Sequence, residues 1–165
     1  MGRAKHKRSG RDGVRFLALP HTVMDSPAFL ELSAPAVRLL LDIARQFDGK
    51  NNGRLVACMA AMKSRGWTSN DTLQYARREL EAAGLLALTR KGARPNKAAW
   101  FALTWAGLDH SSEMDEMKSP ASFPRGAYIA TPADAVRAEQ ARAQEARRQA
   151  KSKAAARRKE CAEAS

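Results

Sequence analysis

The sequence predicts a mainly helical protein with one small β-hairpin, an α+β fold, followed by a long solvated C-terminal helix. Between residues 33 and 83, apolar residues recur at helical spacing in three short segments. Two apolar runs separated by a turn-rich basic loop come next. Beyond residue 132 the chain consists largely of Ala, Arg, Glu, Gln and Lys, all of which are strong helix formers.

The first helix is expected to begin directly after Ser33 and to end before Asp48. Ser33 can act as its N-cap, and Pro35 suits its first turn. Its apolar positions are Val37, Leu40, Leu41, Ala44 and Phe47. Two glycines and two asparagines between residues 48 and 53 end this helix, and two prolines upstream prevent a longer one.

A second and a third helix follow the extended piece 54–56. The second is expected over residues 57–65, and Gly66-Trp67 then turns the chain. Thr68 or Ser69 can cap the third helix, which runs to about residue 83, and Gly84 stands where a C-terminal cap belongs. The buried stripe of this third helix is expected to be Leu73, Ala76, Leu80 and Ala83.

Two strands, 85–90 and 98–104, are expected to form a hairpin whose basic tip is residues 91–97. The expected elements follow the order of a winged helix-turn-helix, which is helix, short strand, helix, turn, helix, strand, basic loop and strand. The sequence therefore predicts four parts: a flexible basic arm at 1–13, a winged-helix domain at 14–108, a linker at 109–131 and a basic helix or disordered tail at 132–165. Val136 is the only large aliphatic residue of the tail, so the tail is expected to be solvated or to fold on a partner.

The charge of the chain favours a polyanionic partner. A formal net charge of +12 and a pI near 10.4 suit DNA, RNA or an anionic membrane surface. No run approaches the ~18 consecutive apolar residues of a membrane span. The absence of a signal-peptide pattern and the wide spacing of Cys58 and Cys161 favour a reducing cytoplasm.

Three runs carry a resemblance to a known family. They are Lys50-Asn-Asn-Gly-Arg-Leu55, Met62-Lys-Ser-Arg-Gly-Trp67 and Arg78-Glu-Leu-Glu-Ala-Ala-Gly-Leu85. Over roughly residues 16–108 the chain resembles bacterial winged-helix DNA-binding proteins carried on plasmids and prophages. The resemblance implies DNA binding for transcription control, or for plasmid or phage replication, at the nucleoid or a plasmid in the bacterial cytoplasm.

The third helix is the expected recognition helix. In helix-turn-helix docking, the N-terminal residues of this helix reach base edges in the major groove. The residues expected to read bases are Ser69, Asn70, Asp71, Gln74, Tyr75 and Arg78. Asn and Gln can pair with adenine and Arg with guanine, whereas the free amides of the first turn suit a phosphate. The alternative is an ordinary solvated helix face.

Two groups of cations are expected to bind the DNA backbone. The first group is Arg90, Lys91, Arg94, Lys97, Lys63 and Arg65. One arginine of the hairpin tip could instead enter the minor groove, and a plain solvated hairpin is the alternative. The second group is the N-terminal arm, with Arg3, Lys5, Lys7, Arg8 and Arg11. This arm either tracks an adjacent groove or adds only non-specific affinity.

No pattern in the sequence indicates an enzyme, a cofactor or a metal site. The three histidines are scattered, and Cys58 is expected to be a small core residue rather than a redox sensor. Glu79 and Glu81 diverge on a helix, so we expect them to pair with Arg77, Arg78 or neighbouring cations. The residues expected to pack in the core and the hairpin, rather than to stack on bases, are Trp67, Trp100 and Trp105.

The leading interpretation is a sequence-specific double-stranded-DNA-binding protein that acts as a transcriptional regulator, a repressor of a mobile element. One alternative is a plasmid or phage replication-initiation or maintenance protein. Another, of a different class, is a basic RNA-binding or ribosome-associated protein. Double-stranded DNA is the main expected partner. A second copy of the chain is also expected, because operators are usually read by two-fold pairs, and the C-terminal helix can take a protein partner. No membrane partner is expected.

Overall fold

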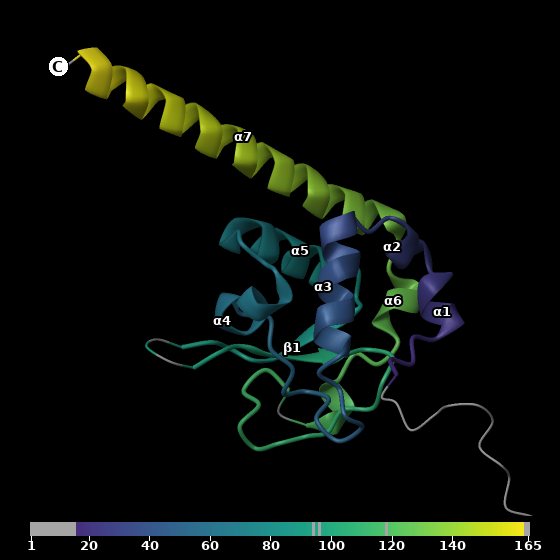
Figure 1. Cartoon of the computed structure of the whole chain (residues 1–165). Coiled ribbons are helices and arrows are strands. Elements are labelled where there is room, and N and C mark those ends of the chain that lie inside the picture. Colours follow the sequence, from purple (N-terminus) through teal and green to yellow (C-terminus); the bar gives the residue numbers. More distant parts are fainter. Residues whose placement is uncertain (1–15, 94, 96, 118, 164–165) are drawn as a thin grey trace, which may run out of the picture.

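The structure, a computed structural model, describes residues 16–163 apart from Arg94, Asn96 and Lys118, with side chains as far as residue 157. It is mainly helical and contains a two-stranded antiparallel hairpin (Figure 1). The helices are α1 (His21–Met24), α2 (Pro27–Leu30), α3 (Ala34–Ala44), α4 (Met59–Met62), α5 (Asn70–Ala82), α6 (Ala127–Ala130) and α7 (Ala133–Glu163). The strands are β1 (Leu86–Arg90) and β2 (Trp100–Leu103), and the 3-10 turns are η1 (Lys63–Arg65) and η2 (Pro120–Ser122).

Helix α3 begins where the sequence predicted, but its buried face differs. The Ser33 hydroxyl caps it by accepting a 3.4 Å hydrogen bond from the amide of Ala36. Leu41, expected inside, is 42% exposed, and the helix ends before Phe47. The buried face is Ala36, Leu39, Leu40, Ile43 and Ala44. Three consecutive leucines leave the spacing ambiguous, and packing against α5 selects the face that is buried.

The second expected helix is shorter than predicted, because α4 passes into η1 before Gly66, whose positive φ of 81° turns the chain. Helix α5 agrees closely with the prediction. The Ser69 hydroxyl accepts a 3.2 Å hydrogen bond from the amide of Thr72 and so caps the helix. Gly84 follows it with a φ of 66°, the left-handed conformation that favours glycine. The predicted stripe of Leu73, Ala76, Leu80 and Ala83 is buried.

The hairpin pairs Leu86 with Leu103 and Leu88 with Phe101, with an irregularity between Leu88 and Arg90. Leu55 bridges to Phe101, so the short extended piece lies beside β2. Asn52, expected to do no more than help end the first helix, is fully buried and ties this region together. Its amide donates to the carbonyls of residues 103, 106 and 107, and its oxygen accepts from the amide of residue 103.

The segment expected to be a linker contributes to the interior. Met114 and Tyr128 are 3% and 5% exposed, and Val136 in the first turn of α7 is completely buried. The tail therefore does not start as a solvated helix, because its one large aliphatic residue packs on the same core as α5. Helix α7 runs past α2 and α5 and then projects well beyond the rest of the chain (Figure 1). None of the helices described here is long and apolar enough to cross a membrane.

Candidate nucleic-acid interface

The turn that leads into α5 is held by one buried carboxylate. Asp42 of α3 accepts hydrogen bonds from the Trp67 indole at 2.9 Å and from Nε of Arg65 at 2.8 Å. The guanidinium of Arg38 lies 5.1 Å from the centre of the Trp67 ring, on its face. These interactions fix the start of α5 relative to α3. They also bind Arg65, which the sequence predicted to face a phosphate, although its side chain stays 44% exposed.

Helix α5 begins with exposed residues, and Arg78 further along it is exposed as well. Of the six residues expected to read bases, four are exposed: Ser69, Asn70, Asp71 and Arg78. The other two, Gln74 and Tyr75, are half-buried. Gln74 accepts a 3.1 Å hydrogen bond from Nε of Arg77, and the Tyr75 ring lies 4.7 Å from the guanidinium carbon of Arg147 on α7. Tyr75 therefore faces α7, because α7 covers that flank of α5.

The two glutamates of α5 have different partners. Glu81 pairs with Arg77 at 2.6 Å, as expected. Burial raises the pKa of the Glu81 carboxyl, and its attraction to Arg77 opposes that shift. Glu79 pairs with no arginine among the described residues, which differs from the prediction for this residue. It is buried and accepts hydrogen bonds from the amide and hydroxyl of Ser33 and from the side chain of Gln140.

The base of the hairpin is covered by acidic side chains. We call residues 113–116 the acidic connector. Arg90 lies on the face of Trp100, 3.2 Å from the ring centre, and pairs with Glu113 at 3.1 Å, so its side chain is only 15% exposed. Lys91 pairs with Glu116 at 2.7 Å, and this hydrogen bond raises the pKa of Lys91. Both cations, expected to bind phosphates, already have carboxylate partners.

The remaining cations expected at the DNA backbone divide into two groups. Lys63 and Lys97 are exposed and have no ion-pair partner among the described residues. Arg94 and the whole N-terminal arm, Arg3, Lys5, Lys7, Arg8 and Arg11, lie outside the described residues. Lys63 lies in η1, which precedes α5, and Lys97 lies in the hairpin.

A groove of about 440 Å³ separates α5 from the hairpin. Gln74 and Arg77 line it from α5, and Lys91 and Lys97 line it from the hairpin. Cys58 also lines this groove and is half-buried, which differs from its expected place in the core. Of the three cations that line this groove, Arg77 and Lys91 are paired with Glu81 and Glu116, and Lys97 forms no ion pair with any described residue. The periodicity of apolar residues could not reveal the groove, because one of its walls is a helix and the other is a β-hairpin, and the two have different apolar repeats.

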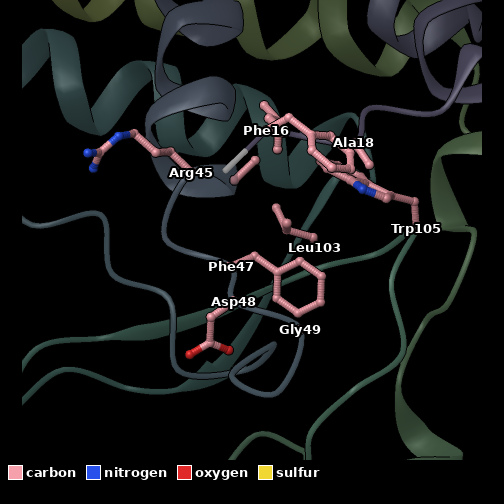
Figure 2. Close-up of a pocket in the computed structure, with 10 residues that line it drawn as sticks. Phe16, Ala18, Arg45, Phe47, Asp48, Gly49, Leu103 and Trp105 are labelled. Carbon is pink, nitrogen blue, oxygen red and sulfur yellow. The ribbon is translucent and has the colours of Figure 1, made fainter. Parts of the chain in front are cut away.

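A larger cavity, of about 560 Å³, lies beside the C-terminal end of α3 (Figure 2). Its lining is largely apolar, with Phe16, Phe47, Leu103 and Trp105 around it. Arg45 lies at its margin. Of the three tryptophans, Trp67 is buried in the core as expected, whereas Trp105 is half-buried at this cavity. Among the described residues, no group of three His, Cys, Asp or Glu side chains is placed to hold a metal ion.

Comparisons of the chain with protein-family models, with curated proteins and with solved structures find no match. The function of the chain is therefore inferred from its own geometry and charge. The exposed residues of α5, the groove between α5 and the hairpin, and the cations of α7 are the features that bear on it.

Proposed function

We propose that this chain is a sequence-specific double-stranded-DNA-binding protein built on a winged helix-turn-helix, and that it acts as a transcriptional regulator, a repressor of a mobile element. In this proposal α4 and α5 are the helix-turn-helix, α5 is the recognition helix, and β1 and β2 are the wing. The observation that carries the proposal is the exposure of Ser69, Asn70, Asp71 and Arg78 on α5, the helix whose Gln74 and Arg77 line the groove beside the hairpin.

The exposed residues suit the edges of bases. Arg78 can make two hydrogen bonds to guanine, Asn70 can make two to adenine, and Asp71 can accept from cytosine. Lys63 and Lys97 are exposed and suit phosphates of the backbone. The absence of carboxylate partners for these two lysines among the described residues supports this assignment.

The proposed role at a mobile element rests on the charge of the chain and on the resemblance of its sequence to winged-helix proteins of plasmids and prophages. A net charge of +12 favours a polyanion. The resemblance to plasmid and prophage proteins favours a mobile element and the bacterial cytoplasm. Because operators are usually palindromic, we propose that two copies of the chain bind each site.

The decisive experiment is selection of bound genomic fragments by the full chain, followed by gel shifts on the enriched duplex and on a scrambled duplex. Arg78→Ala is expected to weaken binding to the enriched duplex by ~1–3 kcal/mol and to reduce the preference over the scrambled one. Arg45→Ala is the control, because Arg45 is exposed at the far end of α3. Equal losses on both duplexes for Arg78→Ala would refute base reading, and displacement of the duplex by RNA at equal concentration would favour the RNA-binding alternative.

A further inference from the structure

Helix α7 contains a segment whose cations have no carboxylate partners among the described residues. Arg148, Lys151, Lys153 and Arg157 are exposed and form no ion pair with any residue described. Glu145 is the one acidic residue between positions 140 and 157. We call residues 148–157 the basic arm. Its charge is therefore uncompensated along about three turns of helix.

The basic arm is attached to α5 through a fixed anchor. Val136 is buried in the core, Gln140 donates to Glu79 of α5 at 2.8 Å, and Arg147 lies over Tyr75 of α5. Arg137 adds a bidentate ion pair with Glu31 after α2. No glycine or proline interrupts residues 133–163. The helix therefore continues from its anchor as a stiff extension whose direction is set by α5.

We propose that the basic arm binds the phosphate backbone of the DNA duplex beyond the segment read by α5. This inference rests on the proposed function, since it places the duplex against α5. The arm has no large apolar residue, which argues against a coiled-coil partner and against a membrane surface, because both need an apolar stripe. The ten residues of the basic arm span about 15 Å at 1.5 Å per residue. That length equals about four base pairs at 3.4 Å per step.

The test compares two variants of the full chain with equal loss of charge. The arm variant carries Arg148→Gln, Lys151→Gln and Lys153→Gln, and the control carries Arg45→Gln, Lys50→Gln and Arg125→Gln. The control residues are exposed and lie outside α7. Glutamine is a good helix former, and circular dichroism checks that α7 remains helical in both variants. Dissociation constants are measured on the enriched duplex from 50 to roughly 200 mM KCl, the range over which phosphate binding dominates.

For the arm variant, we expect the slope of log K against log salt to become shallower by about 0.9 for each phosphate that the arm no longer neutralises. We also expect lengthening the duplex by about four base pairs on one side to tighten wild-type binding but not binding of the arm variant. Equal slopes in the arm and control variants would overturn the inference while leaving the proposed function standing. Failure of the wild-type chain to bind any duplex would overturn both. Arm-dependent binding to an RNA duplex in preference to DNA would assign the arm to RNA and overturn the inference.

Discussion

Gln140 and Glu79 are 61 residues apart in the sequence, yet the Gln140 side chain donates a 2.8 Å hydrogen bond to the Glu79 carboxylate. The same carboxylate accepts hydrogen bonds from the amide and hydroxyl of Ser33, at the start of α3. One buried acidic residue on α5 therefore joins the beginning of α3, the recognition helix of the proposal and the anchored end of α7.

Glu79→Ala is expected to destabilise the chain by about 2 kcal/mol, because it removes a buried acceptor from the partly buried donors of Ser33 and Gln140. Glu81→Ala is the matched control two residues away. Glu81 pairs with Arg77 in a partly exposed position, so its loss should cost less than about 1 kcal/mol. Urea unfolding of both variants measures the difference. Equal destabilisation would contradict the role assigned to Glu79.

Val136→Ala is expected to lower the free energy of unfolding by about 2 kcal/mol, because the side chain is completely buried. Two truncations sharpen this prediction. Ending the chain after Thr131 removes Val136 and Gln140 and should lower the melting temperature. Ending it after Gln149 removes, among the residues whose side chains are described, only exposed ones, at positions 150–157, and should leave thermal stability nearly unchanged. Equal melting temperatures for the two truncated chains would show that α7 is not anchored as described.

The ion pair between Glu31 and Arg137 is expected to depend on pH. The hydrogen bond from Arg137 lowers the pKa of the Glu31 carboxyl below its ordinary value. A carboxyl whose pKa is lower in the folded chain contributes stability above its unfolded pKa, and that contribution is lost as the pH falls through the folded pKa. An NMR titration of Glu31 should show a low midpoint that rises in Arg137→Gln. Arg142→Gln is the control, since Arg142 pairs with Glu139, and it should leave the midpoint where it was.

The acidic connector is expected to weaken DNA binding by occupying hairpin cations. Replacing Glu113 and Glu116 by Gln frees Arg90 and Lys91 from their carboxylate partners. We expect tighter binding to duplex DNA and a slope of log K against log salt that is steeper by about 0.9 for each additional phosphate neutralised.

The control for this prediction removes the same charge elsewhere, with Asp25→Asn and Asp134→Asn, which are exposed and lie outside the hairpin and its connector. If both double variants tighten binding equally, the effect reflects net charge and the connector does not compete with phosphates.

Helix α5 was predictable because local signals agree there. Ser69 at its start, a period-3.6 apolar stripe and Gly84 at its end each act within one or two turns of chain, so the sequence alone places the helix. The existence of the hairpin and of a long C-terminal helix followed from equally local preferences. The buried face of α3 could not be predicted in this way, because its adjacent leucines are compatible with more than one apolar stripe.

The partners of the candidate site depended on the tertiary structure. Tyr75 and Arg90 have the same local sequence signals whether they face solvent or another segment. Arg147 on α7, 72 residues away along the chain, lies over Tyr75. Glu113 in the acidic connector, 23 residues away, pairs with Arg90. Charge and periodicity report on near neighbours in sequence, whereas these interactions form only when the packing of Val136 and Met114 brings distant segments onto the core. The sequence alone was enough to place α5, and only long-range packing decided which of its side chains remain exposed.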